Sequence, residues 1–366
     1  MSIELNKGLT SYRFFAFLSV YLFHFGFLDF GYIGVHAFFV LSGFLLTPIL
    51  LEMKNDLPVK KYFIHFYGRR ALRIFPLYFF YLICISIIAY VALYIYEYDV
   101  NNRFAQTLEQ LPYAATYTYN FFTIQADYKQ TQTITHFWSL AVEEQFYLLW
   151  PLVLILTPKK KLMQVLLLVI ITAPVVRLLV ASASLKWPDI FNSYSMTAYT
   201  FTFSSFDAFA IGGLFAVYVK SIKWQYILIL IFMTFLLGVV TEYYSLGNLK
   251  LTALGFRSFM GDSYKYIWGF SLFSLIFACL LVKIKNRECL PSLIEHPIFV
   301  YLGTISYGLY VYHFPIMYFF NAETPFLIKE IQLLVVFFLS LLVSVISYEF
   351  MEKRFLNKKD SFFCRQ

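Results

Sequence analysis

Long apolar stretches separated by short polar segments run through the whole chain. Ten of them are about as long as a bilayer core requires, because roughly 20 helical residues at 1.5 Å each cover about 30 Å. They are residues 9–28, 32–52, 74–96, 137–157, 162–181, 203–219, 224–241, 264–282, 298–320 and 331–350. The pattern predicts an all-α integral membrane protein with about ten transmembrane helices.

The distribution of charge predicts the orientation of these spans. Hydrophobic residues make up 60% of the chain and charged residues 14%. Most of the 29 Lys and Arg residues fall at the two ends and after every second span, which the positive-inside rule places in the cytoplasm. We therefore expect cytoplasmic termini in a multi-pass protein of the inner (cytoplasmic) membrane. The net charge of +8 is explained by topology, so we expect no nucleic-acid partner.

The chain is predicted to be one transmembrane domain, residues 1–352, followed by a basic cytoplasmic tail, residues 353–366. The first apolar stretch is too long for a signal peptide and lacks a small-residue cleavage site, so it is expected to be retained. The longest external stretch, about 97–136, is expected to form a lid or short amphipathic pieces. The four cysteines lack metal-binding or disulfide spacing, and no metal is expected.

The first span contains an arginine and a histidine, Arg13 and His24. An arginine near the centre of a membrane helix costs roughly 2.5–3.5 kcal/mol on insertion scales, so it needs a functional or structural reason. At about 100° per residue the two side chains come within roughly 20° of one face, about 16 Å apart along the helix.

Other ionisable residues are predicted at the depth of His24, in the outer third of the membrane. They are Glu143, Glu144, Asp207 and His313. Each alone is equally well explained by a hydrogen bond between helices. Their shared depth favours a common polar cavity.

One face of the fourth span is polar. Ser139, Glu143 and Tyr147 follow at four-residue spacing and form one stripe. Glu144 points about 100° away, so we assign Glu143 to the cavity and expect Glu144 to bond a neighbouring helix.

Three arginines, Arg69, Arg70 and Arg73, stand just ahead of Pro76 and the third span. Positive-inside bias is the simpler explanation for any basic loop. Guanidinium groups also bind phosphate bidentately, so the cluster suits a polyphosphate. Ser42, in Leu41-Ser42-Gly43-Phe44, lacks the context of a nucleophile and is expected to permit close helix packing.

These motifs together resemble those of acyltransferase family 3, the integral membrane O-acyltransferases that modify carbohydrates. The resemblance rests on Arg13 to His24, on Gly34 to Phe44, on Arg69-Arg70 with Arg73 to Tyr78, on Trp138-Ser139-Leu140-Ala141-Val142-Glu143-Glu144-Gln145-Phe146-Tyr147, and on Ile305 to Tyr310 with His313 and Pro315. It covers the whole chain.

The resemblance implies a cytoplasmic acyl-CoA donor, usually acetyl-CoA, and an acceptor hydroxyl on an extracytoplasmic carbohydrate, free or lipid-linked. O-antigen, capsule and exopolysaccharide are all suitable acceptors. It makes Arg13 and His24 the essential pair. We expect supporting roles for Ser42, Trp138, Ser139, Tyr147, Asp207 and His313. The secreted esterase-like domain of some members is not expected here.

The chain departs from the family pattern in two places. His36 stands where many members carry Asp, which leaves the role of this side chain open. Glu352-Lys353-Arg354 replaces the usual Glu-x-Pro, and we expect this change to affect only a helix end.

The hypothesis that follows is acyl transfer through the membrane. The CoA phosphates bind Arg69, Arg70 and Arg73, the pantetheine arm passes Arg13, and His24 acts as general base. Glu143 orients the imidazole. Arg13 alternatively polarises the thioester, and an acyl-histidine intermediate is an open variant. The rival function is a transporter or flippase that uses Arg13, His24 and Glu143 as a proton or substrate path, although no inverted repeat supports it.

Overall fold

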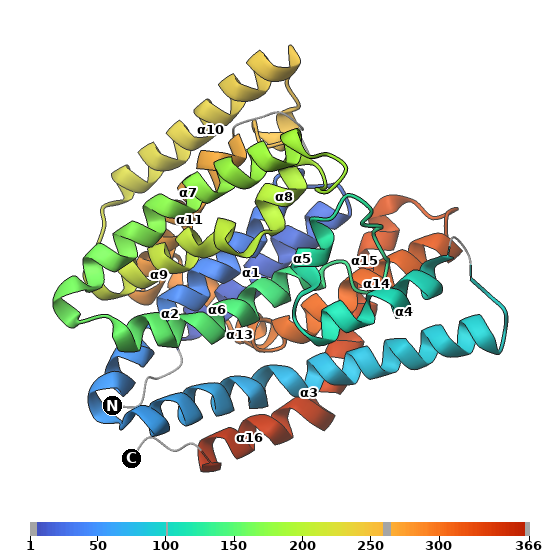
Figure 1. Ribbon diagram of the computed structural model, residues 1–366, viewed down its shortest axis with the longest axis horizontal. Helices are drawn as coiled ribbons and strands as arrows, with labels where there is room; N and C mark the ends of the chain where they lie inside the picture. Colours follow the sequence, from blue (N-terminus) through green and yellow to red (C-terminus); the bar gives the residue numbers. More distant parts are fainter. Residues whose placement is uncertain (1–5, 100–101, 259–264, 363–366) are drawn as a thin grey trace. The chain divides into compact units, whose positions relative to one another are not determined.

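The computed structural model describes residues 6–99, 102–258 and 265–362, and these residues form helices without a β-sheet (Figure 1). The prediction of an all-α protein is thereby confirmed for the described chain. The chain divides into two compact units. Unit 1 is Met1–Asn55, Thr123–Asp127 and Leu148–Thr304, and unit 2 is Asp56–Phe122, Tyr128–Tyr147 and Ile305–Gln366.

Unit 1 holds most of the helices. They are α1 (Lys7–His24), η1 (Gly31–Ile33), α2 (Gly34–Asp56), the second half of α6 (Phe137–Leu156), η3 (Lys159–Lys161), α7 (Leu162–Lys186), α8 (Tyr194–Thr200), η4 (Thr202–Ser205), α9 (Phe206–Tyr218), α10 (Trp224–Leu246), η5 (Leu251–Ala253), α11 (Lys265–Lys285), α12 (Pro291–Ile294) and α13 (Pro297–Thr304).

Glycine allows two pairs of helices in unit 1 to touch backbone to backbone. A Cβ on Gly43 of α2 would lie 1.9 Å from the carbonyl oxygen of Phe209 in α9. A Cβ on Gly303 of α13 would lie 2.0 Å from the carbonyl oxygen of Thr10 in α1. Such approaches exclude any side chain, so these glycines set the positions of α1 and α2.

A lysine closes the C-terminal end of α6 in unit 1. The Nζ of Lys54 donates hydrogen bonds to the carbonyl oxygens of Leu154 at 2.8 Å and Thr157 at 2.6 Å. The last carbonyl groups of a helix lack partners within the helix, and a cation there also interacts favourably with the helix dipole. One turn earlier, Trp150 Nε1 donates to Thr47 Oγ1 at 3.0 Å.

Unit 2 contains α3 (Val59–Tyr94), α4 (Arg103–Ala115), α5 (Tyr119–Thr123), the first half of α6, α14 (Ser306–Glu323), α15 (Lys329–Ser347), η6 (Tyr348–Glu352) and α16 (Lys353–Phe362). α14 packs along α15, and α16 lies along the first half of α3 (Figure 1). The predicted tail is thus helical from Lys353 to Phe362. Residues 363–366 lie outside the described part of the chain.

Helix α3 begins earlier than the hydrophobic pattern predicts. The third span was predicted to start at residue 74, but the helix starts at Val59 and continues through Pro76. Arg69, Arg70 and Arg73 therefore lie inside a helix, not in a loop ahead of one. Hydropathy identifies only the part of a helix that is apolar enough for the hydrocarbon core of a membrane. Helix α3 also includes the more polar residues 59–73 ahead of that part.

In the described part of the chain, seven helices are long and apolar enough to cross a membrane by length and composition. These are Gly31–Asp56, Val59–Tyr94, Phe137–Leu156, Lys159–Lys186, Trp224–Leu246, Tyr266–Lys285 and Lys329–Lys358. The pair Tyr194–Thr200 and Thr202–Tyr218, bent by 72°, would make an eighth. The predicted span 298–320 is interrupted at Ile305, between α13 and α14. The count of ten and the cytoplasmic termini stay predictions.

The stretch that was predicted to be external forms the short helices α4 and α5, which buried polar side chains hold in place. The hydroxyls of Thr107 and Thr133 are 2.8 Å apart, and Tyr81 Oη donates to the carbonyl oxygen of Thr133 at 2.6 Å. Tyr119 Oη donates to Gln110 Oε1 at 2.6 Å, and Gln110 Nε2 donates to the carbonyl oxygen of Lys129 at 2.8 Å. We name residues 103–136 the threonine segment.

Candidate active site

Helix α1 carries Arg13 and His24 without interruption. Its N-terminus is capped by Asn6, whose side chain accepts a hydrogen bond from the backbone N–H of Leu9 at 3.2 Å. Arg13 and His24 are both partly exposed, and His24 is the last helical residue. Because the helix is intact between them, their Cα atoms are separated by about 16 Å along its axis.

In unit 2, Tyr147 connects a carboxylate to an arginine. Its Oη donates a hydrogen bond to Glu143 Oε1 one helical turn away on α6. The Cζ atom of Arg70 lies 5.7 Å from the centre of the Tyr147 ring, a cation–π contact. The structure thus brings together Glu143 and Tyr147 of the predicted stripe with one of the three predicted arginines.

The second arginine of this cluster, Arg73, lies three residues after Arg70 on α3 and is partly exposed. Arg69 is partly exposed on the same helix. We call Arg70, Arg73, Glu143 and Tyr147 the arginine–carboxylate cluster.

Glu144 lies beside this cluster. It follows Glu143 on α6, and Tyr117 lies in the loop after α4. Within the described residues, Glu144 Oε1, Tyr117 Oη and Arg70 Nε are buried without a hydrogen-bond partner. Buried polar atoms are seldom left unpaired, so these are the atoms that a polar ligand can pair with.

Ser139 and His313 meet in a second buried network of unit 2. Ser139 Oγ and Tyr310 Oη share a hydrogen bond of 2.6 Å, and both oxygens lie within hydrogen-bond distance of the carbonyl oxygen of His136, to which the hydroxyl that accepts in the shared bond donates. His313 Nδ1 contacts the carbonyl oxygen of Tyr310 at 2.8 Å, and since a carbonyl only accepts, this nitrogen is the donor. His136 was not identified as a candidate from the sequence. It lies just before α6, and its Nε2 is 3.0 Å from the carbonyl oxygen of Val311 on α14, so it connects these two helices.

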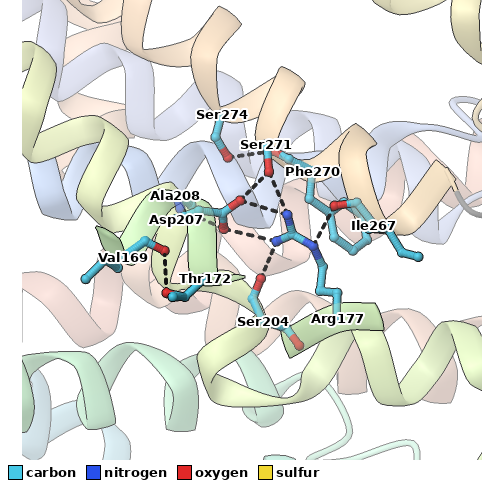
Figure 2. A network of polar contacts seen from close by, with 10 residues as sticks. All are labelled: Val169, Thr172, Arg177, Ser204, Asp207, Ala208, Ile267, Phe270, Ser271 and Ser274. Atoms are coloured by element: carbon cyan, nitrogen blue, oxygen red, sulfur yellow. Dashed lines mark hydrogen bonds and ion pairs between the residues drawn. The ribbon is translucent and has the colours of Figure 1, made fainter. Parts of the chain in front are cut away.

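Asp207 lies in unit 1 and forms a closed ion pair with Arg177, as Figure 2 shows. Arg177 Nη2 also contacts Ser271 Oγ at 2.6 Å, and its Nε contacts the carbonyl oxygen of Ile267 at 2.9 Å. Both charged side chains are fully buried. Arg177 was missed by sequence reasoning, although a lone arginine in the apolar run of α7 is itself the signal that a buried partner exists.

The remaining predicted residues occupy varied surroundings. His36 is fully buried beside this ion pair, its ring 4.4 Å from that of Phe270. Ser42 is partly exposed, next to the close contact made by Gly43. Trp138 is buried near the start of α6.

The predicted site residues therefore divide between the units. Arg13, His24, Ser42 and Asp207 belong to unit 1. Unit 2 contains the three arginines, Trp138, Ser139, Glu143, Tyr147 and His313. The coupling of His24 to Glu143 stays a prediction. No group of three or more His, Cys, Asp or Glu side chains that could hold a metal ion occurs among the described residues.

Comparison with known proteins adds an independent line of evidence. "Putative peptidoglycan O-acetyltransferase YrhL" of Bacillus subtilis is 36% identical over 153 residues, which are 40% of this chain and 23% of that protein. "O-acetyltransferase OatA" of Staphylococcus aureus is 26% identical over 390 residues, covering 98% of this chain and 60% of that protein. The chain thus spans less than two thirds of each relative. No solved structure matches it.

The family comparison covers far more of the chain than the YrhL match does. The model of the acyltransferase 3 family, described as an acyltransferase domain, matches residues 6–349. That range includes both residues of α1, the arginine–carboxylate cluster and the buried network around Ser139. The chain belongs to acyltransferase family 3.

Proposed function

We propose that this protein is a membrane O-acyltransferase that moves an acetyl group from cytoplasmic acetyl-CoA to a hydroxyl of an extracytoplasmic carbohydrate. The observation that carries the proposal is the uninterrupted helix α1, which presents Arg13 and His24 as partly exposed residues in a chain of this family. The names of the relatives support the acetyl group, and the name of YrhL makes peptidoglycan the first acceptor to test.

His24 serves as the general base in this mechanism. Its imidazole takes the proton of the acceptor hydroxyl while the hydroxyl oxygen attacks the thioester carbonyl. The tetrahedral intermediate collapses, the carbon–sulfur bond breaks, and the CoA thiolate takes the proton back from His24. An imidazole suits both steps because its ordinary pKa lies near neutral pH.

Arg13 and His24 are too far apart along α1 to contact the same part of the acyl donor. With about 16 Å of helix between the two residues, we place Arg13 along the extended arm of CoA and His24 at the thioester. The arginines of α3 bind the phosphate groups, since planar guanidinium groups pair bidentately with phosphate oxygens.

The test is CoA release by the full chain in bilayer nanodiscs, with radiolabelled acetyl-CoA and a panel of peptidoglycan, O-antigen and capsule fragments. We expect label on one acceptor. His24→Ala should reduce kcat by about 10²–10⁴-fold, the usual contribution of a general base. His296→Ala removes an exposed histidine outside this site and should leave the rate unchanged.

A second pair of variants tests the arginine. Arg13→Lys should raise KM for acetyl-CoA, whereas Arg287→Lys, which alters an exposed ion pair with Glu295, should not. Movement of a substrate across the bilayer without CoA release would overturn the proposal and favour the transporter.

A further inference from the structure

A tyrosine in the loop after α4, Tyr117, is held by contacts from α3 and α6. Its ring stacks on the ring of Tyr78 in α3, with 4.4 Å between the ring centres and 24° between the ring planes. Gln145 of α6 donates a hydrogen bond from Nε2 to the carbonyl oxygen of Tyr117 at 2.7 Å. Two helices therefore fix both the ring and the backbone of this residue.

The backbone of Tyr117 has a conformation that a bulky residue seldom adopts. Its φ is 53°, in the left-handed region. Its N–H donates to the carbonyl oxygen of Ala114 at 3.0 Å, and the N–H of Thr118 donates to that of Tyr113 at 2.9 Å. Backbone strain of this kind persists only where the surrounding contacts hold it, and it is frequent at ligand sites. The strained turn is what places the Tyr117 ring against α3.

The hydroxyl group of Tyr117 contributes no hydrogen bond to the described fold. Tyr117 Oη is buried and lacks a partner among the described residues. The hydroxyl of Tyr78, on the ring stacked against it, instead donates to the carbonyl oxygen of Ala114 at 2.7 Å. Burying a hydroxyl without a partner costs free energy, so phenylalanine would pack better than tyrosine at position 117. The Tyr117 hydroxyl is therefore a group that a ligand can use.

Two more unpaired polar atoms belong to residues beside the same turn of α6. Glu144 Oε1 and Arg70 Nε are buried without a hydrogen-bond partner in the described chain. The Arg70 guanidinium contacts the ring of Tyr147 at 5.7 Å, whereas Tyr117 is bonded by Gln145. At about 100° per residue, Glu144 lies between Tyr147 and Gln145 on the surface of α6. The unpaired carboxylate oxygen thus belongs to the part of α6 that the loop and α3 both contact.

We propose that Tyr117 and Glu144 bind an amide group of the arm of the acyl donor. This inference rests on the proposed function, because CoA carries two amide groups between its phosphates and its thiol. An amide has one donor and one acceptor. Tyr117 Oη donates to the amide oxygen, and Glu144 Oε1 accepts from the amide N–H. Tyr78, which stacks on Tyr117, lies eight residues after Arg70, about 12 Å along α3, so an arm that starts at the arginines passes Tyr117.

The test compares Tyr117→Phe with Tyr113→Phe in the full chain in bilayer nanodiscs. Phenylalanine keeps the ring that stacks on Tyr78 and removes only the hydroxyl group. We expect Tyr117→Phe to raise KM for acetyl-CoA and Kd for CoA by about tenfold, because the amide oxygen loses its buried partner. Tyr113→Phe changes an exposed tyrosine one turn earlier and should alter neither constant.

Thermal unfolding separates ligand binding from a role in folding. Without CoA, Tyr117→Phe should be at least as stable as wild type, since it removes an unpaired buried hydroxyl. At a fixed concentration of CoA its Tm should rise less than that of wild type, because stabilisation by a ligand depends on the ratio of its concentration to Kd. A variant that is less stable than wild type without CoA would show that the fold itself uses the hydroxyl, and the inference would fail.

A fragment of the donor separates its arm from its phosphates. Adenosine 3′,5′-bisphosphate carries phosphate groups but no arm. As a competitor of acetyl-CoA it should have the same Ki for wild type and for Tyr117→Phe. Arg73→Gln should raise this Ki, because the proposed function places that arginine at the phosphates.

Glu144 is tested with acetyl-CoA analogues in which CH2 replaces one amide N–H. Glu144→Gln should bind normal acetyl-CoA a few-fold more weakly than wild type, and Glu109→Gln, an exposed change on α4, should not. With one of the two analogues, wild type and Glu144→Gln should bind equally, because the bond to Glu144 is already absent. A difference that persists with both analogues would contradict this role of Glu144.

The outcomes distinguish this inference from the proposed function. Wild type that neither binds CoA nor releases it from acetyl-CoA overturns the proposed function. Wild type that does both, with Tyr117→Phe showing unchanged KM and Kd, overturns only the role of Tyr117. A rise in the Ki of adenosine 3′,5′-bisphosphate as large as the rise in KM also overturns it, since the hydroxyl would then act on the phosphates.

Discussion

Arg177 directs two guanidinium nitrogens at the two carboxylate oxygens of Asp207, at 3.1 and 2.9 Å. The carbonyl oxygens of Ser204 and Ile267 and the hydroxyl of Ser271 take its other three N–H bonds. The buried arginine is thereby fully satisfied and ties α7 to α9 and α11 (Figure 2). The Arg177–Asp207 ion pair therefore has a structural role in unit 1.

Replacing Arg177 should therefore destabilise the protein strongly. Arg177→Lys cannot reproduce the planar, bidentate contact and leaves a poorly compensated buried carboxylate, so the free energy of unfolding should fall by about 3–5 kcal/mol. SDS-induced unfolding in bicelles measures this change. The double variant Arg177→Met with Asp207→Leu should be more stable than Arg177→Lys, since it leaves no buried charge. A double variant no more stable than Arg177→Lys would contradict this view of the pair.

Close packing at Gly43 predicts a second loss of stability. In Gly43→Ala the new methyl group overlaps the backbone of Phe209, which has no flexible end to move, so we expect a cost of at least about 2 kcal/mol. Gly247→Ala is the comparison. That position has a φ of 68° but no atom within 4 Å of its Cβ, so only backbone strain of roughly 1 kcal/mol applies. Equal costs at both positions would argue against the backbone contact.

Tyr147 allows its two contacts to be separated. Tyr147→Phe keeps the ring beside Arg70 but removes the hydrogen bond to Glu143, so kcat should fall by about tenfold with little change in KM for acetyl-CoA. Tyr147→Leu also removes the cation–π contact and should raise KM a few-fold. Steady-state CoA release measures both constants. Identical kinetics in the two variants would show that the ring contact is irrelevant.

The loop contact of Asp29 predicts a pH dependence of stability. Burial raises the pKa of Asp29, but hydrogen bonds from Thr252 and Lys250 and the nearby charges of Lys250 and Arg257 outweigh it, and the pKa lies below the ordinary value of 3.8. A lowered carboxyl pKa stabilises the fold above the unfolded-state value and loses this effect as pH falls through the folded value.

Asp29→Asn should consequently be less stable than wild type at pH 7 by roughly 0.5–1 kcal/mol, since Lys250 is half exposed. The difference should shrink as the pH falls below the ordinary pKa of 3.8 and vanish once the pH is below the folded-state pKa of Asp29. Thermal unfolding as a function of pH measures it, with Lys250→Gln expected to show the same trend. A difference that persists at low pH would assign the effect to the Thr252 hydrogen bond alone.

The sequence predicted local geometry well where a single helix determines it. The four-residue spacing of Glu143 and Tyr147 predicted a shared face, and the two side chains are hydrogen-bonded in the structure. Arg13 and His24 likewise lie on one intact helix. Helical periodicity requires only the residues themselves and is readable without a fold.

Relations between distant segments were less accessible. Arg177 pairs with Asp207 thirty positions away, and the π-helical turn Tyr348–Glu352 has no periodic signal in the sequence. The break at Ile305 was also missed, because hydropathy continues unchanged from α13 into α14. Such features depend on tertiary packing. In a single sequence the only signs of this packing are isolated charged residues and small residues within apolar runs.

The buried hydroxyl contacts of the threonine segment affect how the membrane sidedness of this chain should be determined. A reporter inserted between residues 103 and 136 would separate Thr107 from Thr133, so its signal would record misfolding instead of the side of the bilayer. The turn after α10 is a better position, because Leu249 is exposed and Gly247 has open space around it. A cysteine at Leu249, labelled from one side with an impermeant reagent, would report the sidedness of that turn without disturbing the fold.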